Sequence, residues 1–464
     1  MITVQTHRQR RHQLMNRVDG PILLMGNGNR SRNLPMNALP FRQDSTFLYF
    51  TGCHTPNTAA LLVDGHSTLF VHPPADDDAL WHGHTPSLDE IQRQHGFEAI
   101  RPIAELENAC QALGPISTIA VADVTVNNRA EKLTGMPLGF GTQNGTHELI
   151  EAVISMRRSL CEEELEEIRK TALVTDAAHR AAMAVTHVGG HEREVASVFN
   201  AVIAAHGLTT AYQSIVTIHG EVLHNHHYTN TLEAGQLLLL DGGAEAKSGY
   251  ATDVTRTWPV TGTFTPRQRA VYDAVLASQE AGIAMVVNGT RYRDIHTQCS
   301  LVVSQFLFDE GLIKALPEDA VESGAHALFF PHGVGHLLGL DVHDLENFGD
   351  RAAYPKGRKR SPQFGTGYLR LDLDLEPGMV VTIEPGIYFV PAILKSTELY
   401  ERFKDQVDFD RAHEWLGFGG VRIEDDVAVT KGTPDVLTGI IPKTVSEMTE
   451  AMTTPFIWES FTPR

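Results

Sequence analysis

The sequence has little cysteine and no cysteine motif. Its 464 residues include four cysteines, and no two of them form a Cys-X-X-Cys pair. They are Cys53, Cys110, Cys161 and Cys299. Cysteines so far apart predict neither a disulfide framework nor a thiolate metal site, which fits a reducing compartment. We therefore expect a cytoplasmic protein.

Long apolar runs and an excess of positive charge are also missing. No apolar run follows the basic N-terminal residues, so we expect neither a signal peptide nor a membrane span. The chain has 38 basic and 57 acidic residues, a formal net charge of −19. Nucleic acids and anionic membranes attract positive surfaces, so neither is an expected partner. The basic run at 356–360 resembles a nuclear-import signal in composition, but within a long loop it predicts a solvated segment.

The pattern of apolar segments divides the chain into two regions. Short strands and helical stretches alternate up to about residue 155, which is typical of an α/β layer with a mixed or parallel sheet. The expected strands are 21–25, 59–63, 67–71 and 118–122. Ser159 and Glu162 form a predicted capping box that begins a long helix. We predict an N-terminal domain at residues 1–155 and a second domain at residues 156–464.

Two acidic residues of the second region lie at the ends of predicted strands. Asp241 follows four leucines, and Asp253 lies in an alternating segment, with a glycine-rich stretch between them. A single Asp after a strand is more often a turn or a helix cap. Two such residues on facing strands of a hairpin would instead present both carboxylates to the same ions.

Histidines and two glutamates complete the candidate set. His332, His336 and His343 lie within twelve residues that also contain three glycines, which favours a site over a structural role. The pattern is not the HExxH zinc motif, because Gly333 occupies the position of its glutamate. Glu384 precedes a Pro-Gly pair. Glu424 shares a strand face with Arg422, which alone would fit a buried ion pair equally well.

Taken together, four carboxylates and one imidazole predict a metal centre. The predicted ligands are Asp241, Asp253, His336, Glu384 and Glu424. Such an acidic cluster needs cations to neutralise it, and oxygen ligands suit Mn²⁺, Mg²⁺ or a similar hard ion. Five ligands with bridging carboxylates indicate two adjacent ions, the arrangement of a two-metal hydrolase.

These motifs, in this order, resemble the proline-specific metallopeptidases of the pita-bread fold, namely Xaa-Pro dipeptidase (prolidase) and aminopeptidase P. The segment PFRQDSTFLYFTG at 40–52 is similar to the opening domain of these peptidases. The resemblance covers nearly the whole chain. It implies an α+β fold, in which a smaller α/β N-terminal domain precedes a pita-bread catalytic domain with a curved antiparallel sheet backed by helices.

The resemblance also implies roles for the ligands. Asp241 and Asp253 would bind the second ion, His336 and Glu384 the first, and Asp253 and Glu424 would bridge. The ions would be Mn²⁺ in the first instance, with Co²⁺ or Zn²⁺ as alternatives. A hydroxide shared by the ions would attack the Xaa-Pro carbonyl, and Glu384 would carry the proton to the proline nitrogen.

Further residues are assigned to the substrate by the same resemblance. His343 and His224, with His227 as an alternative to the latter, would steady the substrate and the oxyanion. His332 would relay protons. The predicted substrate-binding residues are Arg370, Arg422 and Trp81, with Trp81 reaching across the interface of a homodimer; a tetramer is the alternative.

Two features separate the branches of the family. Arg370 lies 14 residues before Glu384, where prolidases resemble one another in placing an arginine for the dipeptide carboxylate. The insertion at about 391–418 also looks prolidase-like, whereas FLYFTG is closer to aminopeptidase P. We therefore predict a dipeptidase, with aminopeptidase P acting on longer peptides as the alternative. A catalytically silent peptide-binding module on the same fold would show replaced ligands, and all five are present.

Overall fold

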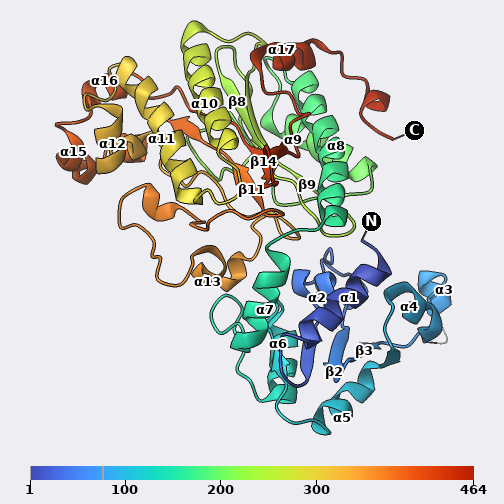
Figure 1. The fold of residues 1–464 in the computed structure, drawn as a ribbon. Helices are drawn as coiled ribbons and strands as arrows, with labels where there is room; N and C mark the ends of the chain where they lie inside the picture. The colour runs from blue at the N-terminus through green and yellow to red at the C-terminus, as the bar shows by residue number, and fades with distance from the viewer. Residues whose placement is uncertain (1, 76–77, 464) are drawn as a thin grey trace. The chain divides into compact units, whose positions relative to one another are not determined.

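The computed structural model of the protein describes residues 2–75 and 78–463. Contacts divide the chain into two units, shown in Figure 1. The first comprises Met1–Arg158 and Leu345–Ala352, and the second comprises Ser159–Asp344 and Ala353–Arg464. A short segment from far along the chain therefore belongs to the N-terminal unit.

The first unit contains a five-stranded mixed sheet in the order β4-β3-β2-β1-β5. Its strands are β1 (Ile22–Met25), β2 (Ala59–Val63), β3 (His66–Val71), β4 (Ala99–Pro102) and β5 (Ser117–Thr118). The pairs β1–β2 and β2–β3 are antiparallel, while β3–β4 and β1–β5 are parallel, as a mixed sheet requires. The strand expected at 118–122 is shorter than predicted, because the backbone N–H of Ala120 turns away to donate to the carbonyl of Asn144.

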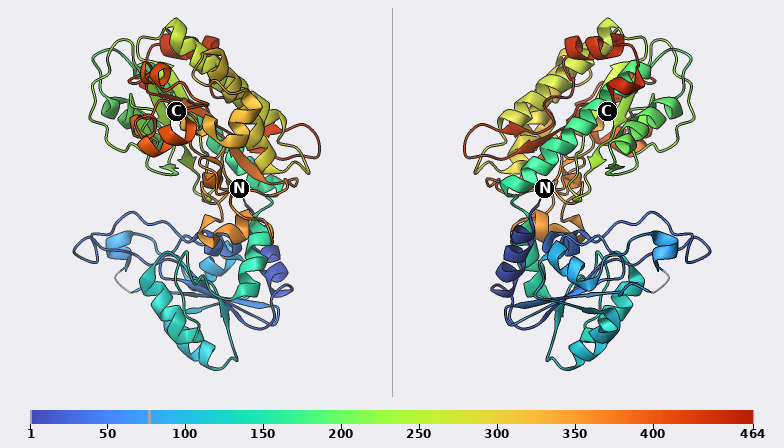
Figure 2. Two further views of the ribbon diagram at one scale, coloured as in Figure 1. Left: turned by 90° about the vertical axis from the view of Figure 1, so that its left-hand side faces the viewer. Right: turned by 90° about the vertical axis from the view of Figure 1, so that its right-hand side faces the viewer.

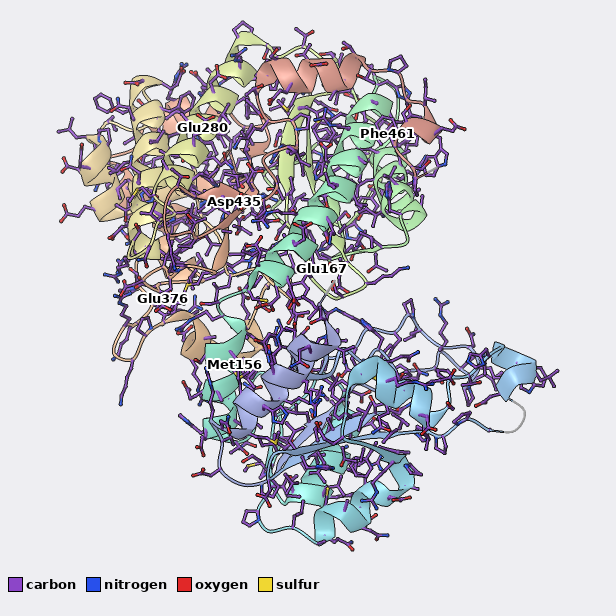
Figure 3. The ribbon with its side chains drawn as sticks, turned by 45° about the vertical axis from the view of Figure 1, so that its right-hand side comes forward. Met156, Glu167, Glu280, Glu376, Asp435 and Phe461 are labelled. Carbon is purple, nitrogen blue, oxygen red and sulfur yellow. The ribbon has the colours of Figure 1, made fainter. Side chains whose placement is uncertain are left out.

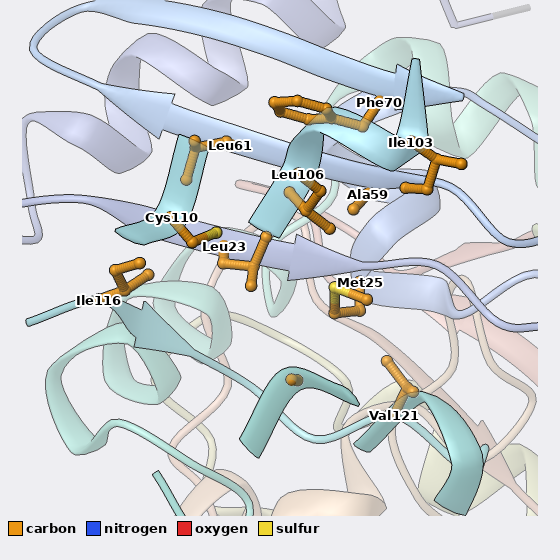
Figure 4. Close-up of a cluster of buried hydrophobic side chains, with 11 residues drawn as sticks. Leu23, Met25, Ala59, Leu61, Phe70, Ile103, Leu106, Cys110, Ile116 and Val121 are labelled. Atoms are coloured by element: carbon orange, nitrogen blue, oxygen red, sulfur yellow. The ribbon is translucent and has the colours of Figure 1, made fainter. Parts of the chain in front are cut away.

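Helices cover this sheet and close its core. They are α1 (Val4–Met15), α2 (Ser45–Thr51), α3 (Asp78–His82), α4 (Leu88–His95), α5 (Leu106–Gln111), α6 (Val124–Thr134) and α7 (His147–Arg157), with 3₁₀ turns at Ile103–Glu105 and Glu346–Phe348. Figure 4 shows Leu23, Phe70 and Leu106 meeting between the sheet and α5; all three are fully buried. Burial of such side chains is the main stabilising contribution to this unit.

The second unit is built from short antiparallel ladders. Its strands are β6 (Thr209–Thr210), β7 (Ile215–Thr217), β8 (Leu237–Asp241), β9 (Ala244–Glu245), β10 (Thr255–Pro259), β11 (Val380–Ile383), β12 (Gly386–Tyr388), β13 (Gly420–Arg422), β14 (Asp425–Ala428) and β15 (Asp435–Val436). They pair in the orders β10-β8-β7, β11-β14-β15, β12-β13 and β6-β9. Every one of these pairs is antiparallel.

Helices pack around these ladders. The longer ones are α8 (Glu162–Val185), α9 (Glu192–Ala205), α10 (Pro266–Ala284), α11 (Tyr292–Asp309) and α17 (Val445–Thr453). The shorter ones are α12 (Pro317–Ser323), α14 (Pro391–Leu394), α15 (Thr397–Phe403) and α16 (Phe409–His413), with 3₁₀ turns at Ala325–Leu328, Thr366–Tyr368 and Trp458–Ser460. The short helix α13 (Asp350–Ala353) begins in the segment Leu345–Ala352 of the first unit. Figure 2 shows α10 and α11 side by side. Among the helices of the described residues, none is both long and apolar enough to cross a bilayer.

The start of α8 differs from the expected one. The capping box joins Cys161 and Glu164, whose carboxylate accepts the Cys161 N–H at 2.7 Å, so the predicted box of Ser159 and Glu162 is wrong by two residues. Leu160 is held outside the helix because its N–H donates to the carbonyl of Gly378. Further along α8, which carries the labelled Glu167 in Figure 3, Arg169 binds Asp435 at 2.7 Å and joins the helix to β15.

Candidate metal centre and active site

The first pair of acidic residues is placed by strands β8 and β10. Four buried leucines form β8 and end at Asp241, which pairs with Thr255 at the start of β10. Asp253 lies two residues before β10, and its N–H donates to Asp426 at 3.0 Å. The chain turns tightly between the two acids: a Cβ on Gly243 would lie 1.8 Å from the Thr252 carbonyl oxygen, which only glycine permits.

The second pair comes from strands β11 and β14. Glu384 directly follows β11, Glu424 directly precedes β14, and the two strands pair with Ile383 opposite Asp425. The antiparallel register therefore brings both glutamates to the same end of the ladder. Glu424 accepts a hydrogen bond from the Thr255 hydroxyl at 2.7 Å, which links it to β10.

His336 lies beside β11 in a constrained backbone. Its N–H donates to the Thr382 hydroxyl at 3.1 Å, and its carbonyl accepts from the Thr382 N–H at 3.0 Å. The preceding Gly335 has φ of +151°, and a Cβ there would lie 2.3 Å from the Thr382 carbonyl oxygen. The Nδ1 of His336 donates to the Leu337 carbonyl at 3.0 Å, so Nε2 is left to face the acids, 3.4 Å from Asp253.

The structure brings the five predicted ligands together. Three groups have ligand atoms within 4.8 Å of one another: Asp241, Asp253 and Glu424; His336, Glu384 and Glu424; and Asp253, His336 and His343. The first two groups share Glu424, so one carboxylate lies between two clusters. This donor set, rich in oxygen and buried, fits two adjacent hard divalent cations.

The acids of the cluster are poorly stabilised as anions without cations. Burial, with a further contribution from Asp253, raises the pKa of Glu384 to about 7, against the opposing charge of His336. Burial and the neighbouring carboxylates raise the pKa of Glu424 well above its usual value. Burial likewise raises the pKa of Asp241. Cations bound here would displace protons from these groups.

Asp253 and His336 behave as a pair. Burial favours the neutral form of each, but their mutual hydrogen bond and charge attraction, together with further neighbours, outweigh it, so the pKa of Asp253 is lowered and the pKa of His336 is raised. The raised pKa values are therefore those of the other three acids, Glu384, Glu424 and Asp241.

A cavity of about 760 Å³ opens over the cluster. Besides all five predicted ligands, its lining includes the predicted site residues His224, His332, His343, Arg370 and Arg422. His226 also lines the cavity, whereas His227 is not among its described lining residues. The ring of His343 lies edge-on to that of His336, with centroids 4.6 Å apart.

His332 is held as a neutral imidazole. Arg422 donates to the Tyr388 hydroxyl at 2.9 Å, which leaves that O–H to donate to Nε2 of His332, also at 2.9 Å. Nδ1 then donates to the Gly333 carbonyl at 2.8 Å. Burial and the charge of Arg422 lower the pKa of His332 to about 3. Its Nδ1 lies 3.9 Å from Glu384.

Arg422 and Arg370 occupy the cavity in different ways. Arg422 is 4% exposed in its side chain and donates to Asp241 at 2.6 Å and to the Thr255 hydroxyl at 3.1 Å, so it acts first as the counter-charge of an acid. Arg370 is half-buried, and its positive charge adds to the lowering of the pKa of His224 and partly opposes the raising of the pKa of Glu384. An arginine that acts on these groups is not a plain surface residue.

Trp81 is not among the described residues that line this cavity. It belongs to α3 of the first unit and is 62% exposed. Its predicted role at a subunit interface remains a prediction.

Sequence reasoning missed Tyr212. Its hydroxyl hydrogen-bonds to Asp241 at 2.6 Å and also to Asp253. Burial and these acids raise the pKa of Tyr212 well above its usual value, so it stays a donor. A single tyrosine after a two-residue strand gives no signal in the sequence.

A buried ionic network behind the ligands was missed as well. Arg256 of β10 donates to Asp425 at 2.8 Å and to the Glu424 carbonyl at 2.6 Å. Lys443, Gln279 and the Thr438 hydroxyl also donate to Asp425, at 2.9, 2.8 and 2.8 Å. This network fixes the backbone that presents Glu424.

Comparison with known proteins agrees with this geometry. The model of metallopeptidase family M24 matches residues 166–431, and that of the aminopeptidase P N-terminal domain matches residues 7–118. "Probable Xaa-Pro aminopeptidase PEPP" of Pyricularia oryzae is 34% identical over 418 residues, covering 88% of this chain and 86% of the relative. A "Probable Xaa-Pro aminopeptidase" of Fusarium vanettenii is 32% identical, with 88% and 87% covered.

Solved structures extend the likeness to the fold. Zinc-substituted Escherichia coli aminopeptidase P in complex with product has a TM-score of 0.80 at 26% identity, with 97% of this chain and 98% of that chain covered. Pseudomonas aeruginosa aminopeptidase PepP has a TM-score of 0.81 at 27% identity, with the same coverage. The predicted resemblance and the predicted α+β pita-bread fold, with a smaller N-terminal α/β domain, are confirmed.

Proposed function

Because the chain belongs to metallopeptidase family M24, and is therefore a metal-dependent peptidase, we propose that it hydrolyses the bond between a first residue and proline, acting on Xaa-Pro dipeptides. The observation that carries the proposal is one cavity that contains two overlapping metal-ligand groups and, beside them, Arg370. A binuclear hydrolytic centre next to a carboxylate-binding group suits a dipeptide with a free C-terminus.

Two divalent ions would be held by the chain's own donors. Asp241, Asp253 and Glu424 would hold one ion, and His336, Glu384 and Glu424 the other. When bound, the ions would supply Lewis acidity and an activated water at neutral pH. We propose Mn²⁺ first, because four of the five ligands are carboxylates; Co²⁺ and Zn²⁺ are the alternatives.

The proton carrier in this proposal is Glu384. Its carboxylate lines the cavity and belongs to one of the two proposed ligand groups, which would place it beside an activated water as a proton acceptor. The nitrogen of an Xaa-Pro bond carries no hydrogen and must be protonated as it leaves. We assign that step to Glu384, with His332 beside it fixed as a neutral imidazole.

The carbonyl oxygen would be stabilised by histidines of the cavity. His224 and His343 both line it, and burial together with the charge of Arg422 lowers the pKa of His224. A neutral imidazole N–H can donate to the developing oxyanion. His332 completes the proposed set as a relay.

The C-terminal side of the substrate is assigned to Arg370. A guanidinium binds a carboxylate through two parallel hydrogen bonds, which favours a dipeptide over a longer peptide. The second candidate is an Xaa-Pro aminopeptidase acting on longer peptides, and the names of the relatives favour it. A homodimer, with Trp81 near the partner's site, and a tetramer as the alternative, also remain proposals.

The test compares Ala-Pro with Ala-Pro-Ala, using enzyme reconstituted with Mn²⁺ and a chelated control. Preferential cleavage of Ala-Pro supports the dipeptidase, while preferential cleavage of the tripeptide supports the aminopeptidase. Glu384→Ala should abolish turnover in a folded protein, and Asp253→Asn should lose metal. Near-normal turnover of either reconstituted variant would contradict the site.

A further inference from the structure

The basic run at 356–360 is not a wholly solvated loop, contrary to the expectation from its composition. Arg358 donates to the carbonyl of Asp372 at 2.7 Å and to both carboxylate oxygens of Asp374 at 2.9 Å. Arg360 donates to the Leu369 carbonyl at 2.8 Å. Lys359, between the two arginines, is exposed and makes no hydrogen bond or ion pair with any described residue.

These bonds fall on both sides of Arg370. Arg360 binds the residue before it, and Arg358 binds the backbone two residues and the side chain four residues after it. The segment 369–374 has no ladder partner beyond one isolated bridge, from Arg291 to Asp374, among the described residues. Side-chain donors therefore supplement the few main-chain hydrogen bonds of this segment, such as that from the Asp372 N–H to the Ala353 carbonyl at 2.9 Å.

The opposite edge of the segment is held from the start of α11. Arg291 donates to both oxygens of Asp372 at 2.6 Å, and the N–H of Tyr292 donates to the Leu373 carbonyl at 2.9 Å. Asp372 itself is almost fully buried. The extended segment that presents Arg370 thus lies between the basic loop and this helix start.

We propose that Arg358 and Arg360 are positioning residues for Arg370, and that the basic loop thereby sets the preference for substrates with a free carboxylate on proline. The inference deepens the proposed function and rests on it, because it requires Arg370 to bind that carboxylate. Neither residue needs to touch the substrate.

The physical reason is the geometry that two parallel hydrogen bonds require. A guanidinium and a carboxylate pair well only when both hydrogen bonds form in one plane. Arg370 comes from an irregular segment, whose backbone would otherwise shift. A displacement of about 1 Å can cost on the order of 100-fold in an enzyme reaction, so loss of one anchor should be measurable.

The experiment measures KM for Ala-Pro and, in the same assay, the inhibition constant of Ala-Pro amide as a competitor. The competitor reports affinity without the carboxylate, whether or not it is cleaved. The variants are Arg370→Ala, Arg358→Ala and Asp374→Ala, and Lys359→Ala is the matched control from the same run.

We expect Arg370→Ala to raise KM for Ala-Pro about 100-fold and Arg358→Ala about tenfold, with the inhibition constant of the amide unchanged in both. Asp374→Ala should reproduce part of the rise in KM caused by Arg358→Ala. The double variant Arg358→Ala/Asp374→Ala should have the same KM as Arg358→Ala alone. Arg358→Lys should recover only part of the affinity, since an ammonium cannot bind both partners in the same geometry. Lys359→Ala should match the wild type.

The results distinguish an error in the role of the loop from an error in the proposed function. If Arg370→Ala raises KM selectively but Arg358→Ala does not, the role of the loop is wrong and the proposed function stands. If Arg370→Ala has no selective effect, or the wild type does not cleave Ala-Pro, the carboxylate-binding role falls and this inference with it. Equal weakening of Ala-Pro and its amide in Arg358→Ala would indicate general disruption and would also overturn the positioning role.

Discussion

When the metal ions are removed, protons should bind to the carboxylates of the site, and the number of bound protons should depend on pH. The reason is the burial of these carboxylates, reinforced by their neighbouring acids, which raises the pKa of Glu384 to about 7 and the pKa values of Glu424 and Asp241 as well. A divalent cation binds only the deprotonated carboxylates, so reconstitution must expel these protons.

The magnitude follows from Glu384. With a pKa of about 7, this group is ~90% protonated at pH 6 and ~10% protonated at pH 8, so it releases about 0.8 of a proton more at pH 6. The pKa of His336 is raised too, mainly by Asp253, and its proton release changes in the same direction. Metal affinity should accordingly rise by about tenfold or more from pH 6 to pH 8.

The assay is titration calorimetry of chelator-treated protein with Mn²⁺, in buffers of different ionisation enthalpy at pH 6 and pH 8. The slope of heat against buffer enthalpy gives the protons released. Asp319→Asn, which changes an exposed acid on α12, is the control and should leave the slopes unchanged. Equal proton release at the two pH values would refute the electrostatic reasoning.

Three further predictions concern single side chains. Tyr212→Phe should weaken Mn²⁺ binding about tenfold in a metal titration, because it removes the O–H shared by Asp241 and Asp253. Burial lowers the pKa of His296 to about 3, so this side chain stays neutral in the folded protein. In the unfolded chain it becomes protonated as the pH falls below 6.5, so the free energy of unfolding decreases with falling pH. His296→Leu should abolish about 2 kcal/mol of that loss between pH 6.5 and pH 5 in urea denaturation; unchanged pH dependence would contradict it. Gly335→Ala should lower the melting temperature and metal content together, because its Cβ would collide with the Thr382 carbonyl beside His336.

The elements that the sequence predicts best are those with a local pattern. Four leucines before Asp241 indicate a buried strand with an acid at its end, and β8 ends at that residue. The alternation around Glu424 places Arg422 and Glu424 on one face, and both line the cavity. The four acidic ligands meet because each lies at or near the end of a strand whose pairing is antiparallel, and His336 is held beside β11 by Thr382.

What the sequence did not predict depends on distant partners. Tyr212 acquires its role only because β8 and the segment before β10 place two acids against its hydroxyl. The capping box was misplaced because the contact of Leu160 with Gly378 delays the helix. In our proposal the preference for dipeptides also depends on Arg358 and Arg360, which hold the segment of Arg370 through contacts that the sequence does not show.

The segment Leu345–Ala352 has a consequence for the order in which the protein is made. Asn144 donates to the Asn347 carbonyl at 2.9 Å, Glu151 lies 3.5 Å from Arg351, and Phe348 lines a cavity with Ile150. Residues 345–352 leave the ribosome long after Arg158, when most of the second unit has been synthesised. The N-terminal unit therefore acquires its last native contacts only late in translation, and a fragment ending at residue 158 lacks a piece of its own structure.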